Sequence, residues 1–224
     1  MSFIPVITID GPSASGKGAV AQSLAKILQF HYLDSGLLYR LTALAARRAN
    51  INWPDEARLA ELAAALDIQF EGEEIRLNQA PVGAEARGEA CGADASTIAV
   101  LPAVRAALLA RQRAFRQAPG LVAEGRDMGS VVFPEANLKI YLDASAEIRA
   151  LRRYKQLKEK GMYASLEEIL HGIIARDARD STRSFAPLQK AADTFFLDNS
   201  ELTVAQTTDV ILQLYRKNVP DLAS

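Results

Sequence analysis

The apolar positions at the start of the chain change from a strand pattern to a helix pattern within a few residues. Pro5–Asp10 is a β-branched run that stops at a Gly-Pro pair, which predicts a buried strand ending in a tight turn. From Lys17 to Leu28 the apolar residues fall at helical spacing. The first unit of the chain is therefore a strand, a glycine-rich loop and a helix.

Three further short apolar runs, separated by helical patterns, predict more strands. The expected strands are Gly120–Glu124, Leu138–Leu142 and Thr194–Leu197, the last with Phe195 and Phe196 in the core. The expected helices are Pro102–Gln117, Ala146–Lys160, Ser165–Arg179 and Thr203–Arg216. Strands that alternate with helices are typical of βαβ units, so the sequence predicts an α/β fold with a central parallel β-sheet flanked by helices.

One stretch departs from this alternation. Asp67–Val82 contains two alternating runs, Ile68–Phe70 and Glu74–Leu77, separated by turn residues, which predicts a small antiparallel hairpin. Helical patterns fill the rest of the chain from Leu37 to Arg116. We therefore interpret residues of about 35–100 as an insertion into the parallel-sheet core.

Charge and composition exclude several classes of protein. Lys and Arg number 26 against 27 Asp and Glu, so no overall field attracts nucleic acid or an acidic membrane surface. Cys91 is the only cysteine, which excludes an internal disulfide and a cysteine-based zinc site. The N-terminal residues lack a signal-peptide pattern and no apolar run reaches about 18 residues, so we expect a cytoplasmic protein. Within the cations, arginine outnumbers lysine, and its planar fork suits phosphate groups.

The loop after the first strand carries the strongest motif. Gly11–Lys17 (GPSASGK) matches G-x-x-x-x-G-K between a predicted strand and a predicted helix, which is the context that a phosphate-binding loop requires. Its backbone N–H groups and the helix N-terminus would cradle phosphates, and Lys17 would reach the β- and γ-phosphates. The next two residues, Gly18 and Ala19, lack the hydroxyl that usually binds Mg²⁺. We expect Mg²⁺ to be held by phosphates, waters and other side chains, and assign no metal ligand.

Two other nucleotide-binding patterns fit less well. Gly16–Ala21 also matches the dinucleotide pattern G-x-G-x-x-A, with Asp34 near the expected acidic position. In that alternative, however, Lys17 would occupy the crevice that the pyrophosphate approaches. A regulatory GTPase would need D-x-x-G and N-K-x-D strings, and the sequence contains neither.

Arginines gather at four further places along the chain. These are Leu33–Arg40, Glu124–Gly129, the helical face Arg149, Arg152, Arg153 and Gln156, and the segment Ile174–Arg183, where Asp177 and Asp180 alternate with Arg176, Arg179 and Arg183. Surface ion pairs or a solvated helix face would explain each place taken alone. Beside a phosphate loop they favour a kinase for two phosphorylated nucleotides, because phosphoryl transfer spreads negative charge over the oxygens of the moving group.

Several longer motifs carry a family resemblance. They are ITIDGPSASGKG, LDSGLLYR, LPAVRAALLARQR, GLVAEGRDMGSVVFP, KIYLDAS and RDARDSTR followed by APL, in order from residue 7 to about 188. By these motifs the chain resembles the bacterial cytidylate (CMP) kinases. The resemblance implies a P-loop NTPase fold and the use of ATP and Mg²⁺ to phosphorylate CMP and dCMP in pyrimidine nucleotide metabolism. It also implies a single domain over 1–224, expected as a monomer: a core of about 1–34, 101–148 and 177–224, an NMP-binding insert of about 35–100 and a short helical lid of about 149–176.

The resemblance also implies a role for each matching residue. The ATP ligands would be Gly11, Pro12, Ser13, Ala14, Ser15, Gly16, Lys17, Gly18, Ala19 and Arg153. The CMP ligands would be Arg40 and Arg126 at the phosphate with Ser13 nearby, Ser96, Arg105 and Asp127 at cytosine with Ser35 beside them, and Arg176 and Asp180 at the ribose. The catalytic residues would be Lys17, Arg126, Arg176 and Arg183, and Arg149, Arg152 and Arg153 would lie with Arg183 on the lid side. Ala14, Ser15 and Ala19 stand where the family usually has Gly, Ala and Thr.

These assignments make chemical sense. Cytosine carries an N4 amine where uracil has an O4 acceptor, so the Asp127 carboxylate would favour cytosine. The acceptor is already a phosphate oxyanion, so no general base is needed and lid closure would exclude water. Two alternatives stay open: another small-molecule kinase, acting on UMP or a hydroxyl acceptor, and a nucleotide-binding regulator without catalysis.

Overall fold

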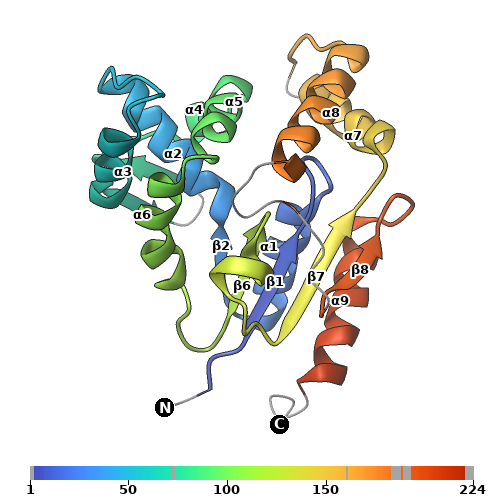
Figure 1. Cartoon of the computed structure of the whole chain (residues 1–224). Helices are drawn as coiled ribbons and strands as arrows, with labels where there is room; N and C mark the ends of the chain where they lie inside the picture. Colours follow the sequence, from blue (N-terminus) through green and yellow to red (C-terminus); the bar gives the residue numbers. More distant parts are fainter. Residues whose placement is uncertain (1–2, 72–73, 160, 183–187, 189–192, 220–224) are drawn as a thin grey trace. The chain divides into compact units, whose positions relative to one another are not determined.

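The computed structural model describes residues 3–71, 74–159, 161–182, 188 and 193–219. The chain divides into two compact units (Figure 1): unit 1 contains residues 1–33 and 115–224, and unit 2 contains residues 34–114. Each unit has its own β-sheet and is described by itself.

Unit 1 is built on a five-stranded sheet in the order β2-β6-β1-β7-β8. The strands are β1 (Val6–Asp10), β2 (His31–Asp34), β6 (Leu121–Gly125), β7 (Leu138–Asp143) and β8 (Phe195–Asp198). The central strand β1 pairs in parallel with β6 and β7, and β7 pairs in parallel with β8. All residues of β1 and β6 are buried, as expected for the middle of a parallel sheet that is covered on both faces. The prediction of a parallel α/β sheet is confirmed.

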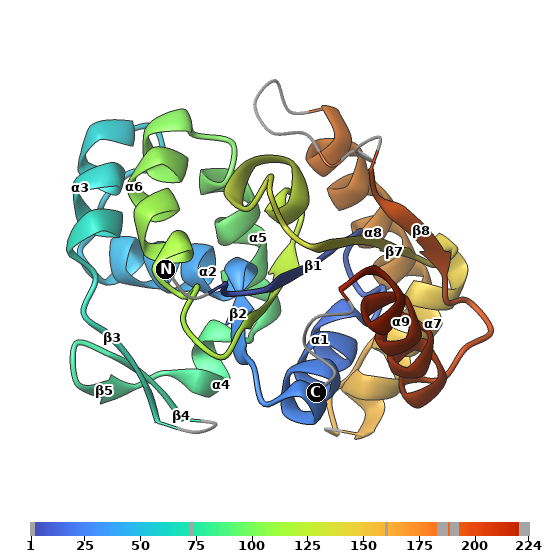
Figure 2. The same cartoon turned by 90° about the horizontal axis from the view of Figure 1, so that it is seen from below.

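Two helices cover one face of this sheet, and a short π-helical turn covers the other (Figure 2). Helices α1 (Lys17–Leu28) and α9 (Val204–Asn218) lie side by side and pack on the strand residues that point toward them. Ile7 and Ile9 of β1 join that core, and the alternation of a strand therefore turns Thr8 and Asp10 toward the turn η1 (Met128–Val132). Thr203 caps α9 in a capping box with Gln206.

Two more helices follow β7 in unit 1. They are α7 (Ala146–Glu159) and α8 (Leu166–Thr182), which pack against each other. In the described part of the chain no single helix is long and apolar enough to cross a membrane. Only α5 (Glu89–Ile98) and α6 (Pro102–Arg113) of unit 2 meet the length and composition criteria as a pair, and this pair is bent by 107°.

The expectation that Phe195 and Phe196 belong to the core is wrong. Their exposed fractions are 43% and 50%. The reason is that β8 is an edge strand with β7 as its one neighbour, so its side chains lie at the border of the sheet. The ring of Phe196 stacks on Tyr141 with ring centroids 6.2 Å apart.

Unit 2 combines helices with a small antiparallel sheet. Its helices are α2 (Ser35–Arg48), α3 (Glu56–Ala65), α4 (Gly83–Ala86), α5 (Glu89–Ile98) and α6 (Pro102–Arg113), and its strands are β3 (Ile68–Glu71), β4 (Glu74–Leu77) and β5 (Ala80–Pro81). The predicted hairpin is confirmed as β3 and β4, to which the short strand β5 adds. Residues of α2, β4 and α4, including Leu41 and Leu77, form a separate core.

Helix α6 lies within unit 2, beyond the expected end of the insert near residue 100. Arg111 of α6 donates from Nη2 to the carbonyl oxygen of Leu66, just after α3, at 2.7 Å. This bond and the packing of α6 on α3 place the end of unit 2 at Ala114. The division into core, NMP-binding insert and lid remains a prediction.

We expect Gly120→Ala to destabilise unit 1. A Cβ atom at Gly120 would lie 2.6 Å from the ring of Phe30, whose ring also makes an edge contact with Tyr215. Forcing a methyl group into such a place costs about 1–3 kcal/mol, or roughly 2–4 °C of melting temperature per kcal/mol at this size. Calorimetry measures the change. Gly172→Ala in α8, where a Cβ atom meets nothing within 4 Å, is the control and should leave the melting temperature equal or higher; equal melting temperatures for both variants would contradict the packing.

Candidate active site

The loop between β1 and α1 has the backbone geometry of an anion cradle. A Cβ atom at Gly11 would lie 2.0 Å from the carbonyl oxygen of Leu142, so only glycine fits there. Gly16 has φ 89° and directly precedes α1, whose first turn carries no side-chain cap in the described part of the chain. The N–H groups at the start of α1 are therefore oriented to bind an anion.

Ala14 gives the loop a local strain. Its φ is 59°, in the left-handed region that glycine adopts without cost. An alanine there costs about 1 kcal/mol. Alanine in place of the family's usual glycine therefore raises the conformational energy of the loop backbone at this position.

Lys17 lies folded against the loop that it follows. Its Nζ donates to the carbonyl oxygen of Pro12 at 3.0 Å and lies 3.9 Å from Oε2 of Glu124, and both side chains are buried. Tyr32 donates from its hydroxyl to Oε1 of the same glutamate at 3.3 Å. The lysine is thus held at the loop by one neutral and one anionic acceptor, both within unit 1.

Glu124 is a candidate metal-side residue that the sequence analysis did not assign. A Cβ atom at Gly18 would lie 3.2 Å from its Oε1, so the carboxylate stands beside the position that usually carries a hydroxyl ligand. The described residues hold no group of three or more His, Cys, Asp or Glu that could enclose a metal ion. A single carboxylate beside the loop, that of Glu124, fits Mg²⁺, which is commonly bound by one or two carboxylates together with substrate phosphates. The sequence does place Glu124 at the end of a predicted buried strand, where ligands of parallel sheets commonly bind.

Three side chains hold the outer side of the loop. Arg149 donates from Nη1 to the carbonyl oxygen of Ser13 at 3.0 Å. Asn199 donates from Nδ2 to the carbonyl oxygen of Ser15 at 2.9 Å, and Nη1 of Arg152 lies 3.4 Å from the same oxygen. The resemblance placed both arginines on the lid side, near the transferring phosphate, and here their guanidinium groups lie on loop carbonyls. Asn199 belongs to no motif recognised in the sequence.

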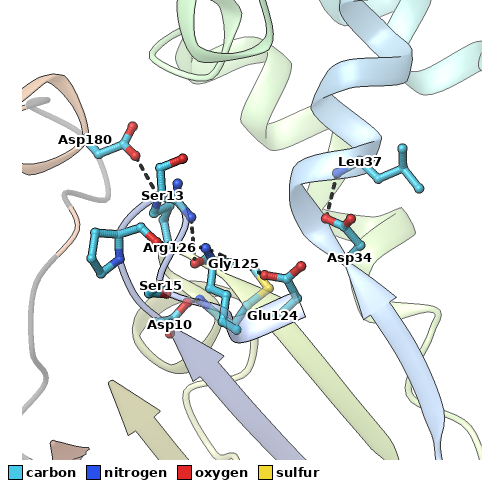
Figure 3. Close-up of polar contacts among 12 residues, drawn as sticks. Asp10, Ser13, Ser15, Asp34, Leu37, Glu124, Gly125, Arg126 and Asp180 are labelled. Atoms are coloured by element: carbon cyan, nitrogen blue, oxygen red, sulfur yellow. Dashed lines mark hydrogen bonds and ion pairs between the residues drawn. The ribbon is translucent and has the colours of Figure 1, made fainter. Parts of the chain in front are cut away.

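Arg126 and Asp180, expected at different parts of one ligand, form an ion pair (Figure 3). Arg126, just after β6, donates from Nε to Oδ2 of Asp180 in α8 at 2.6 Å. Burial alone would lower the pKa of Arg126, but Asp180, and then Glu124 and Asp177, outweigh it and raise the pKa above its ordinary value. A second pair, Arg149 Nη2 and Asp177 Oδ2 at 2.6 Å, joins α7 to α8. Two arginines of unit 1, Arg126 and Arg149, are thus each paired with an aspartate of α8.

The other two arginines of this group lie on the same helices. Arg176 of α8 is half-buried and directly precedes Asp177 in the sequence. Arg153 of α7, expected at ATP, is half-buried and donates from Nη1 to Oε1 of Gln156 at 3.3 Å. Arg183 lies outside the described residues.

Asp10 anchors the segment that carries Asp127. Its two carboxylate oxygens accept from the backbone N–H groups of Met128 and Gly129, each at 2.8 Å. Burial raises the pKa of Asp10 to about 6, against the lowering effect of these two bonds and with a further increase from the charge of Asp127. Asp127 is itself buried, at 3% exposure, and its carbonyl oxygen accepts from Val131 at 2.9 Å. The end of β1 therefore fixes the position of the buried Asp127.

In unit 2, two of the serines expected at CMP belong to helices: Ser35 begins α2, and Ser96 lies in α5. Asp34 caps α2 through its bond from the Leu37 N–H (Figure 3), and the hydroxyl oxygen of Ser35 accepts from Nε2 of Gln112 at 2.9 Å in a buried contact. Ser96 of α5 is buried, and its hydroxyl has no hydrogen-bond partner among the described residues. Gln112 is a buried supporting residue that the sequence analysis missed.

The two arginines of unit 2 that were expected at CMP, Arg40 and Arg105, are anchored by backbone carbonyls. Arg40 donates from Nη1 to the carbonyl oxygens of Ala86 and Gly88, at 3.0 and 2.8 Å. Arg105 is buried, donates to the carbonyl oxygen of Ala99 at 3.2 Å, and lies over the ring of Tyr39 at 5.8 Å from its centroid. Both guanidinium groups are thus positioned by the fold of unit 2 itself.

Comparisons with known proteins agree with the motifs. The family model described as cytidylate kinase matches residues 7–217. A protein named cytidylate kinase from Chromobacterium violaceum is 56% identical over 214 residues, which cover 96% of each chain. Proteins of the same name from Bordetella bronchiseptica and Nitrosomonas europaea are 56% and 52% identical over 212 residues, covering 95% of each chain.

The raised pKa of Asp10 predicts a specific pH dependence of stability. Between pH 3.8, its ordinary pKa, and about 6, the folded state binds more protons at Asp10 than the unfolded state. The contribution of Asp10 to the free energy of unfolding therefore falls as pH rises through this window, by about 3 kcal/mol in total. Asp10→Asn should remove that slope, although it also weakens one of the two backbone contacts. Denaturant unfolding of both proteins from pH 4 to 7 measures this, with a carboxyl-carbon NMR titration expected near 6; a stability difference that does not change with pH would contradict it.

Proposed function

Because the chain belongs to the cytidylate kinase family, we propose that it transfers the γ-phosphoryl group of ATP to the phosphate of CMP, which yields ADP and CDP. The observation that carries the proposal is the phosphate loop between β1 and α1, with Lys17 at its end, in a chain whose match to the family runs over residues 7–217. The proposal extends to dCMP as a second acceptor, to Mg²⁺ as the metal ion, and to a monomer in the cytoplasm.

The phosphate loop is proposed to bind the phosphates of ATP. The residues from Gly11 to Ala19 would surround them, with Lys17 as the mobile cation and Arg153 as a further ligand. Glu124 beside Gly18 would help to hold Mg²⁺, which when bound neutralises charge on the phosphates. Lys17 turns from Pro12 to the ligand at little cost, because it exchanges one oxygen acceptor for another.

Residues in both units are proposed as CMP ligands. In unit 1 these are Ser13, Arg126, Asp127, Arg176 and Asp180, and in unit 2 they are Ser35, Arg40, Ser96 and Arg105. The planar guanidinium of Arg126 supports its role, because it is always charged and its fork of donors matches phosphate oxygens. The buried hydroxyl of Ser96 supports the same assignment, because a polar ligand atom would satisfy it.

Asp127 is proposed as the residue that selects cytosine. Its carboxylate would accept from the N4 amine, whereas the O4 oxygen of uracil would leave it unpaired in a buried place. The acceptor phosphate needs no general base, so catalysis would rest on positioning and on charge neutralisation by Lys17, Arg126 and Arg176. Arg183 stays a prediction for the same role.

The first test compares phosphate acceptors. With saturating ATP and Mg²⁺, a coupled assay of ADP release should give kcat/KM values for CMP and dCMP at least about tenfold above those for UMP and AMP. A higher value for UMP than for CMP would indicate another small-molecule kinase. No ADP release with any monophosphate would indicate a nucleotide-binding regulator.

The second test separates base selection from ATP binding. Asp127→Ala should lower kcat/KM for CMP by about 10- to 100-fold, the cost of one hydrogen bond to a charged group, while the Kd for ATP stays within about threefold. Glu135→Ala, which removes an exposed carboxylate shortly after η1, is the matched control and should change neither quantity. Equal losses of ATP affinity and CMP turnover in Asp127→Ala would remove the base-selecting role.

A further inference from the structure

Asn199 is a buried polar residue whose contacts link distant parts of unit 1. It follows β8 directly and is 3% exposed. Its Nδ2 donates to the carbonyl oxygen of Ser15 at 2.9 Å, and its Oδ1 accepts from Nη1 of Arg152 at 3.1 Å. Its backbone N–H donates to Asp143 at the end of β7, also at 2.9 Å. Both polar atoms of the side chain are therefore hydrogen-bonded, and its backbone N–H is bound to the end of β7.

The peptide that Asn199 contacts precedes a glycine, which lets this peptide turn over. Gly16 has φ 89° and ψ 2°, in the left-handed region. Glycine adopts a negative φ about as readily as a positive one, so the peptide that precedes Gly16 can rotate without a Cβ clash at this residue. The Ser15–Gly16 peptide thus has two accessible orientations, and its surroundings choose between them.

The orientation of this peptide decides what the loop offers to a phosphate. In a trans peptide the carbonyl and the N–H point in opposite directions. While the Ser15 carbonyl is bound to Asn199, the N–H of Gly16 faces away from Asn199. In the turned state the carbonyl oxygen would take the place of that N–H, and a phosphate would meet a partial negative charge in place of a donor.

Asn199 provides the shorter of the two bonds to this carbonyl. Nη1 of Arg152 lies 3.4 Å from the Ser15 oxygen, and the same guanidinium also donates to Oδ1 and to the carbonyl oxygen of Asn199. Arg152 is thus itself oriented by Asn199. Removal of the asparagine side chain would loosen both contacts to the Ser15 oxygen and leave this acceptor without its buried donor.

We propose that Asn199 is a positioning residue for the phosphate loop: it holds the Ser15–Gly16 peptide so that the Gly16 N–H faces the phosphates of ATP. The inference rests on the proposed function in so far as the loop binds ATP. It adds a residue from the far end of the chain, 184 positions from Ser15, to the machinery of that site.

The test uses two substitutions with the same number of side-chain heavy atoms and the same branching as asparagine. Asn199→Asp keeps the acceptor for Arg152 but replaces the donor to Ser15 by an oxygen, and Asn199→Leu removes both without adding charge. We expect each variant to raise the Kd for ATP, and for inorganic tripolyphosphate as a base-free probe, by about tenfold or more. The KM for CMP should stay within about threefold. Calorimetric titration and steady-state kinetics give these values.

Matched controls separate positioning from charge and from stability. Ser200→Asp places the same negative charge one residue further along, and should change the Kd for ATP by less than about threefold. Thermal unfolding of every variant identifies any that does not fold, and Asn199→Leu then serves in place of Asn199→Asp. ATP binding within twofold of the unsubstituted protein, or equal losses of ATP and CMP binding, would overturn the inference. Failure of the unsubstituted protein to phosphorylate CMP would overturn the proposed function, while the ATP and tripolyphosphate titrations would still decide the role of Asn199.

Discussion

The carbonyl groups of the phosphate loop must point outward and find partners there, because its N–H groups can face an anion only in that orientation. The structure meets this requirement from several elements of unit 1. Lys17 binds the Pro12 oxygen, Arg149 binds the Ser13 oxygen, and Asn199 binds the Ser15 oxygen. The close approach of Gly11 to β7 fixes the start of the loop. The loop is thus a backbone structure whose shape depends on side-chain donors at the start of α1, in α7 and just after β8.

The charged side chains inside unit 1 likewise depend on partners from other elements. The net charge of -1 conceals buried and partly buried cations that are paired with carboxylates, Arg126 with Asp180 and Arg149 with Asp177. A buried ion without a partner is strongly unfavourable, so the aspartates of α8 allow these arginines to lie inside the protein. Asp10 is the contrasting case, because burial raises its pKa to about 6 despite two backbone donors. Its carboxylate joins the end of β1 to the segment that begins with Asp127.

Most elements could be predicted from the sequence because their patterns are local. The strand at Val6–Asp10 and the helix at Lys17–Leu28 were expected within one residue. A β-branched run and a helical spacing of apolar residues can each be recognised within one short stretch of sequence. The hairpin at residues 68–77 was expected for the same reason. Phe195 and Phe196 were placed wrongly because an apolar run does not show whether its strand lies at the centre or at the edge of a sheet. The membership of α6 in unit 2 depends on its packing against α3, which no local pattern records.

By itself, the sequence determined the phosphate loop, the alternation of strands and helices, and the residues whose motifs point to nucleotides, because these are written in short, contiguous strings. The tertiary structure decided which groups support them. Glu124 beside Gly18, Gln112 behind Ser35 and Asn199 at the Ser15 carbonyl come together only through the packing of elements far apart in the chain. Hydrogen bonds between distant residues depend on where the sheet brings its strand ends, and that arrangement exists only in the folded protein.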